Sequence, residues 1–140
     1  MGERATASFG IDRWEEQVAI DDGTTKVVRT TIHKTFTGGL VGTARGAMTM
    51  AHANGTMAYQ GYDLLDIELG GRRGTLVVVH DAWRRGYAGD ARWTILAGSG
   101  TAGLAGIAGT ATIARHDDGS HTLVLDYTLD GSPASAPSPG

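Results

Sequence analysis

Runs in which apolar and polar residues alternate cover most of this chain, and this pattern constrains its fold more than any other feature. Between residues 59 and 69 the odd positions are mostly apolar, whereas Asp66 and Glu68 occupy even positions. A second run, over residues 76–83, follows the turn signal of residues 69–74. Successive side chains of a strand point to opposite faces, so a period of two indicates strands with one buried face.

Eight such runs are separated by glycine-containing turn signals. They span residues 5–14, 26–36, 40–51, 56–69, 76–83, 87–97, 107–115 and 121–129. The polar segment Glu15–Thr25 is predicted to leave the sheet and turn at Asp21-Asp22-Gly23. His52-Ala53-Asn54-Gly55 carries the Asn-Gly pair of tight hairpins. Residues 98–106 hold too many glycines for a stable helix and predict a corner with room for one helical turn.

Regularly spaced strands without helical periodicity predict an all-β fold, an eight-stranded antiparallel up-and-down β-barrel in which the first strand pairs with the last. A two-sheet sandwich is the alternative. Gly42, Ala44, Gly46 and Gly61 favour the barrel, because small residues permit strong bending and leave interior room. They predict a central apolar cavity. We expect a single domain over residues 1–130 and a disordered tail of Ser, Pro, Ala and Gly over residues 131–140.

Charge and composition exclude several classes of function. The net charge is -3, with 12 basic and 15 acidic residues spread along the chain, so we expect no nucleic-acid partner. The chain has no cysteine, and its start lacks the apolar run of a secretory signal. No stretch approaches the ~20 apolar residues of a membrane span. We therefore expect a cytoplasmic protein without a membrane partner.

Two titratable residues lie on the apolar faces of consecutive predicted strands. Asp63 shares its face with Leu65 and Ile67, and His80 shares its face with Val78. Same-face residues of adjacent strands can meet across a hairpin if the register allows, so Asp63 and His80 are candidate catalytic groups, with Tyr127 as a third. The alternative is structural: a buried carboxylate that pairs with Arg72, His80 or backbone donors.

A second set of residues is predicted to line a binding pocket for a small hydrophobic molecule. Met48, Met50, Tyr59 and Trp93 would give the pocket an adaptable wall. The full predicted lining is Met48, Met50, Tyr59, Leu65, Leu76, Val78, Trp93 and Ile95. Ordinary core packing is the alternative.

Metal and phosphate sites are not predicted. The five histidines show no recognised ligand spacing, so we expect no metal and no other cofactor. Residues 98–106 lack the lysine of a phosphate-binding loop.

From Trp14 to Tyr127 the chain resembles a bacterial domain-of-unknown-function family grouped with the allene oxide cyclase-like barrels. The shared motifs are Phe9-x4-Trp14, Lys34-Thr35-Phe36-x-Gly38, Asn54-Gly55-Thr56, Gly61-Tyr62-Asp63, Gly70-Gly71-Arg72-x-Gly74-Thr75, Gly98-Ser99-Gly100-Thr101-x-Gly103-Leu104-x-Gly106-x-x-Gly109 and Leu125-Asp126-Tyr127. The resemblance implies an eight-stranded barrel with a central cavity, related to cyclases that act without a cofactor. Asp63 departs from the pattern, since a glutamate is expected there.

The sequence thus favours a cofactor-free isomerase or cyclase that holds a hydrophobic natural-product intermediate, polyketide or lipid-like, inside a barrel. Containment alone can lower a barrier by several kcal/mol. The same kind of cofactor-free pocket also suits a lyase, so the predicted enzyme class is isomerase, cyclase or lyase. One alternative is a non-catalytic carrier in the lipocalin manner. Another is a filled barrel whose outer face forms a homodimer.

Overall fold

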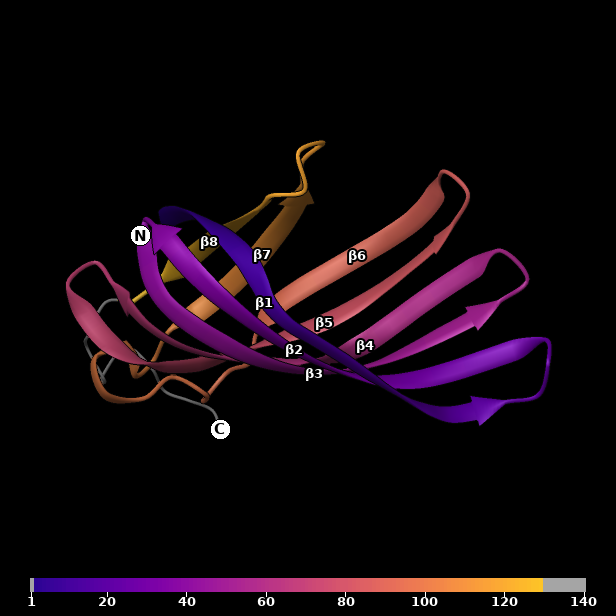
Figure 1. Ribbon diagram of the computed structural model, residues 1–140. Helices are drawn as coiled ribbons and strands as arrows, with labels where there is room; N and C mark the ends of the chain where they lie inside the picture. Colours follow the sequence, from indigo (N-terminus) through magenta and orange to yellow (C-terminus); the bar gives the residue numbers. More distant parts are fainter. Residues whose placement is uncertain (1, 130–140) are drawn as a thin grey trace.

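Eight antiparallel strands, each hydrogen-bonded to the next along the chain, form a sheet that closes into a ring where β1 pairs with β8 (Figure 1). The structure is a computed structural model that describes residues 2–129; the predicted tail over residues 131–140 lies outside the described residues. The strands are β1 (Glu3–Asp21), β2 (Thr25–Gly38), β3 (Leu40–Ala53), β4 (Thr56–Leu69), β5 (Arg72–Arg85), β6 (Ala88–Ile95), β7 (Ala108–Arg115) and β8 (His121–Thr128). The predicted all-β class, the eight strands and the pairing of first with last are confirmed.

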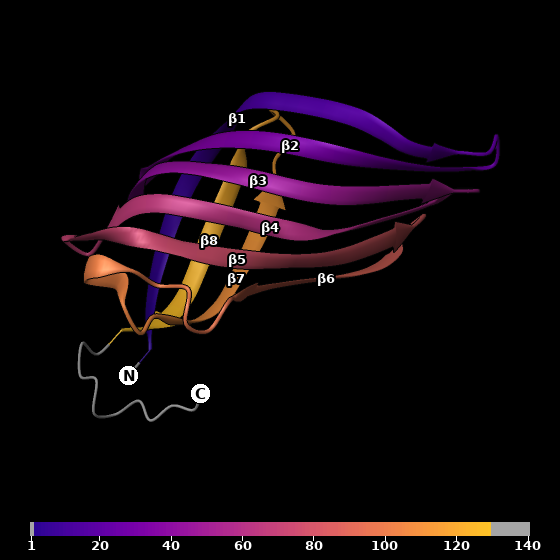
Figure 2. The same cartoon turned by 90° about the horizontal axis from the view of Figure 1, so that it is seen from below.

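The strands differ in length, and this shapes the molecule. β1 to β5 have 14 or more residues, whereas β6, β7 and β8 have eight each. β8 pairs with β1 only as far as Phe9, and β7 pairs with β6 only through Trp93 and Thr94. The ring is therefore closed at one end, while the far halves of β1 to β6 continue past β7 and β8 as a curved sheet (Figure 2).

The predicted excursion at Glu15–Thr25 is wrong, because β1 continues through it to Asp21. Every residue from Gly10 to Asp21 is exposed, so neither face of this segment requires apolar residues. Two register shifts, between Ile11 and Arg13 and between Val18 and Ile20, also break the period of two. Polar composition and bulges together conceal the strand from a pattern-based prediction.

The predicted turns are confirmed in type, with one shorter than expected. β3 and β4 are joined by Asn54 and Gly55 alone, both with positive φ (46° and 84°), as a type I′ turn requires. His52 and Ala53 belong to β3. The glycine-rich corner contains one 3₁₀ turn, η1 (Ala102–Leu104), whose Leu104 is fully buried against β5.

Inward-facing side chains form two hydrophobic clusters. The larger fills the closed end of the ring, with Phe36, Leu65 and Leu76 among its buried members. The smaller lies where the sheet begins to flare and consists of Val28, Ile32, Met48 and Met50, with Tyr59 packed against it. Among residues 2–129, no helix is long and apolar enough to cross a membrane.

Candidate functional site

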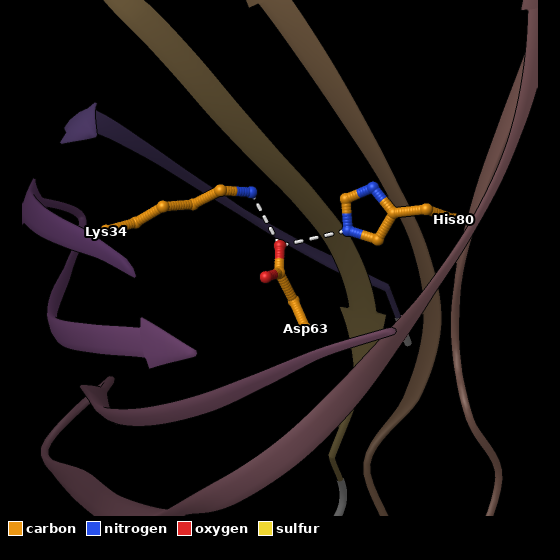
Figure 3. A network of polar contacts seen from close by, with 3 residues as sticks. All are labelled: Lys34, Asp63 and His80. Carbon is orange, nitrogen blue, oxygen red and sulfur yellow. Dashed lines mark hydrogen bonds and ion pairs between the residues drawn. The ribbon is translucent and has the colours of Figure 1, made fainter. Parts of the chain in front are cut away.

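Three charged or titratable side chains meet inside the closed part of the ring: Lys34 from β2, Asp63 from β4 and His80 from β5 (Figure 3). Lys34 Nζ donates to Asp63 Oδ2 at 2.6 Å, and His80 Nε2 lies 3.0 Å from the same oxygen. All three residues are at most 6% exposed. The contact between Asp63 and His80 that the sequence made conditional on register is confirmed.

The register explains why these residues meet. Asp63 lies directly opposite Val78, so His80 is its diagonal neighbour across the β4–β5 ladder. On the other side, Asp63 faces Gly46, and Lys34 faces Ala44. Strands of a closed sheet are tilted and staggered, so residues at one height come from shifted register positions on successive strands. The small residues of β3 leave room for the lysine side chain to reach across to β4.

Gly46 has a specific reason to be glycine. A Cβ atom there would collide with Asp63 Oδ1, which lies directly above the glycine backbone. From the sequence, we interpreted four small residues as leaving the interior open: Gly42, Ala44, Gly46 and Gly61. That interpretation is wrong at Gly46 and Gly61, because the carboxylate of Asp63 occupies the space above the first and the thioether of Met48 covers the second.

The electrostatics of the cluster define a charge for Asp63. Burial by itself raises the pKa of this carboxyl, but the hydrogen bond from His80 and the positive charge of Lys34 together outweigh it, so the pKa lies below its ordinary value. Asp63 is therefore ionised at neutral pH. Its second oxygen, Oδ1, is buried without a hydrogen-bond partner among the described residues.

An ionised carboxylate accepts hydrogen bonds and donates none, so the proton of the contact with His80 must sit on Nε2. In neutral His80 the other ring nitrogen, Nδ1, is then the acceptor. Figure 3 shows this nitrogen on the side of the ring away from Asp63. Within residues 2–129 no side-chain hydrogen bond to Nδ1 is found. The imidazole thus has one nitrogen held by a carboxylate and one available as a base.

Lys34 was missed as a site residue, although its strand was predicted. Five residues of β2 are buried and alternate with exposed or half-buried residues: Val28, Thr30, Ile32, Lys34 and Phe36. The alternation therefore placed a lysine on the inner face. A charged side chain at an inward position is the same signal that identified Asp63, and it could have identified Lys34.

Tyr127 lies away from the cluster. It pairs with Glu3 and Gly109 near the closed end of the ring. Leu123, on the same strand, borders the Asp63 cavity, and Tyr127 is four residues further along, roughly 13 Å at the usual rise per residue. Tyr127 is buried on an inward face as predicted, but the strand tilt puts it at the wrong height to join Asp63 and His80.

The predicted pocket lining is divided between two packed regions. Leu65, Leu76, Val78 and Ile95 belong to the larger cluster, with Trp93 packed against it, and Met48, Met50 and Tyr59 belong to the smaller one. The cavity beside Asp63, Lys34 and His80 has a volume of about 10 Å³, the space of roughly one water molecule. It is much smaller than the central cavity we expected, because Phe9, Phe36 and the side chain of Lys34 are among the residues that crowd it.

Phe9 forms the wall of this cavity opposite the carboxylate. Lys34 Nζ lies 5.0 Å from its ring centroid, and the His121 ring stacks on it with centroids 4.9 Å apart. Burial, followed by the charges of Arg115 and Lys34, lowers the pKa of His121, so this imidazole is mostly neutral at pH 7. The Lys34 charge is therefore balanced by Asp63 and by the face of an aromatic ring.

A larger hollow, of about 1260 Å³, crosses the outer face of β1 to β5. Outward-pointing Arg29, Gln60, Tyr62 and Asp81 are among its walls. Its lining also includes residues whose side chains face inward, Met48 and His80 among them. In the part of the chain that the structure describes, no group of three or more His, Cys, Asp or Glu side chains could hold a metal ion.

The geometry defines a class: a small antiparallel ring sheet with a buried Lys–Asp–His cluster at its centre. Residues 5–127 match the model of the family described as "Protein of unknown function (DUF3224)". The chain belongs to that family. A similar solved structure is that of a protein with unknown function from the DUF3224 family of Shewanella oneidensis MR-1, with a TM-score of 0.84 and 22% sequence identity, covering 93% of this chain and 98% of that one. No curated protein matches the chain.

Proposed function

We propose that this protein is a cofactor-free isomerase or cyclase that moves a proton within a small, largely apolar molecule. The buried hydrogen bond between Asp63 and His80 carries the proposal. It leaves Nδ1 of His80 as a base at the centre of an apolar interior, and it places a carboxylate where an imidazolium would form.

The roles of the three residues follow from their contacts. His80 is the proton-transfer group. Asp63 holds the Nε2 proton, which selects the tautomer and stabilises the imidazolium. Lys34, bound to the same carboxylate oxygen at 2.6 Å, keeps Asp63 ionised and is a positioning residue. This assignment shifts the base from Asp63 to His80.

The chemical step needs no external reagent. Nδ1 takes a proton from an activated carbon, and the electron pair of the broken C–H bond enters the π system of the substrate. The same imidazolium then returns the proton to another carbon of that system, which completes an isomerisation. If the attacked carbon instead carries an oxygen substituent, the electron pair forms a ring C–C bond, the C–O bond breaks, and the imidazolium gives its proton to the displaced oxygen. Both routes balance in protons and electrons.

A molecule larger than water must displace interior side chains. Met48 is suited to this, because its unbranched thioether covers Gly61 directly across from His80. The ring is also weakest nearby: β6 and β7 share two residue pairs, whereas β4 and β5 share 14. We propose that substrate enters through this β6–β7 seam and that the apolar cavity forms around it. The cytoplasmic location and the grouping with the allene oxide cyclase-like barrels remain part of this proposal.

The test is deuterium incorporation from D₂O into a panel of apolar carbon acids of increasing size, from nitroethane to cyclohexanone, read by mass spectrometry. His80→Gln and Asp63→Asn should each lower the rate by roughly 10²–10⁴, the usual contribution of a general base. Arg4→Gln, which removes an exposed ion pair with Asp126, is the matched control and should leave the rate unchanged. Binding without exchange in the wild-type protein would support a carrier and contradict this function.

A further inference from the structure

Three buried hydrogen-bonding atoms of the described residues lack a partner, and one of them belongs to Trp93, which lies directly opposite His80. Within residues 2–129 these atoms are Thr30 Oγ1, Asp63 Oδ1 and Trp93 Nε1. Thr30 and Asp63 are each 2% exposed. Leaving a buried polar group unsatisfied costs about 1–3 kcal/mol, so native proteins keep few of them. Three in one interior require a reason.

Trp93 is the most informative of the three. It lies directly opposite His80 in the β5–β6 ladder, and the two rings meet edge to face with centroids 6.5 Å apart. Tyr59 lies beside His80 as well, at 6.2 Å. Burial raises the pKa of the Tyr59 hydroxyl, and the N–H of Trp93, which lies close to that hydroxyl, opposes the rise. The contact does not have the geometry of a formed hydrogen bond, so Nε1 of Trp93 remains without a full partner among the described residues. Two donors thus lie close together next to the proposed base.

The chemistry of these groups limits what they bind. An indole N–H donates and never accepts, so its partner must be an acceptor atom. An anionic acceptor is disfavoured, because Asp63 is ionised nearby and Lys34 is already paired with it. Trp93 packs against the larger hydrophobic cluster and Tyr59 against the smaller one, so their surroundings are largely apolar. A neutral oxygen on an apolar body meets all three conditions.

We propose that Trp93 Nε1, assisted by the Tyr59 hydroxyl, donates a hydrogen bond to the carbonyl oxygen of the substrate, which makes the substrate class apolar ketones with a hydrogen on the α carbon. This inference rests on the proposed function for the proton step. When His80 removes the α proton, the electron pair moves through the C–C bond and onto the oxygen, giving an enolate. The donors then face the atom on which negative charge develops.

The binding experiment uses the indole ¹H–¹⁵N signals of the three tryptophans, with cyclohexanone and its hydrocarbon analogue methylenecyclohexane as probes. Trp14→Phe and Trp83→Phe assign the Trp93 signal by elimination; both residues are about half exposed, at 47% and 46%, and serve as internal controls. Cyclohexanone should move the Trp93 signal downfield in a saturable way. Methylenecyclohexane should not do so, and the Trp14 and Trp83 signals should stay in place.

The Trp93→Phe variant keeps an aromatic ring and removes the donor. It should bind cyclohexanone roughly tenfold more weakly, the loss of one neutral hydrogen bond, and bind the hydrocarbon as before. Equal shifts with both probes, no shift with either, or unchanged ketone affinity in Trp93→Phe would each overturn the inference. If His80→Gln abolishes exchange while Trp93 fails these tests, proton transfer stands and ketone recognition falls. If the Trp93 signal and the Trp93→Phe variant behave as expected while His80→Gln exchanges at the wild-type rate, ketone recognition stands and proton transfer by His80 is refuted.

Discussion

Replacing Lys34 by methionine tests whether the interior cluster is held together as described. Methionine keeps most of the apolar stem but removes the ammonium, so Asp63, which is 2% exposed, loses one of its two donors. Removing one partner of a buried ion pair costs roughly 3–5 kcal/mol. With an m-value of about 2 kcal/mol/M, the urea midpoint at pH 7 should fall by roughly 2 M.

The pH dependence gives this prediction a sign. The folded-state pKa of Asp63 lies below its ordinary value, so its contribution to stability is complete above the unfolded pKa, about 3.9, and is lost as the pH falls through the folded pKa. Lys34→Met removes one cause of that lowering. The difference between wild type and variant should therefore be largest near pH 7 and should shrink below about pH 4.

Two further proteins make the result decisive. The triple variant Lys34→Met, Asp63→Leu, His80→Phe removes the whole polar cluster, so no buried polar partner is left unpaired, and should recover most of the lost stability, because apolar side chains replace buried ion pairs at little cost. Arg4→Met breaks an exposed pair of similar length, 2.7 Å, and should leave the midpoint nearly unchanged. If Lys34→Met shifts the midpoint no more than Arg4→Met does, the result contradicts a buried ion pair between Lys34 and Asp63.

Two other predictions concern packing and opening of the ring. Gly46→Ala should cost about 1–3 kcal/mol in urea unfolding, since the new methyl group displaces the pinned Asp63 carboxylate, whereas Gly10→Ala, where a Cβ meets nothing within 4 Å, should be neutral. Equal effects would contradict the contact. In hydrogen exchange, the amides that bond across the β6–β7 seam, among residues 93–94 and 110–111, should exchange at least tenfold faster than those central to the β4–β5 ladder. Equal protection would mean that the seam is not where the ring opens.

The local chemistry of the sequence determined the strands and their faces. Period-two alternation is a property of a single strand, so it could place Asp63 and His80 inward without knowledge of their neighbours. Turn chemistry is local too, which is why Asn54-Gly55 was located correctly. The same alternation places Lys34 on the inner face of its strand, so a local pattern also indicates this third member of the cluster. β1 beyond Gly10 gave no such signal, because a segment exposed on both faces has no reason to alternate.

The tertiary structure alone decided which inward residues share a height. Strand tilt in a closed sheet shifts the register from strand to strand, and that shift brings Lys34, Asp63 and His80 together while leaving Tyr127 near the closed end. It also decided what lies above each small residue, since whether Met48 covers Gly61 or points elsewhere depends on side chains from neighbouring strands. Periodicity states which face a residue occupies; only the packing of all eight strands states what it meets there.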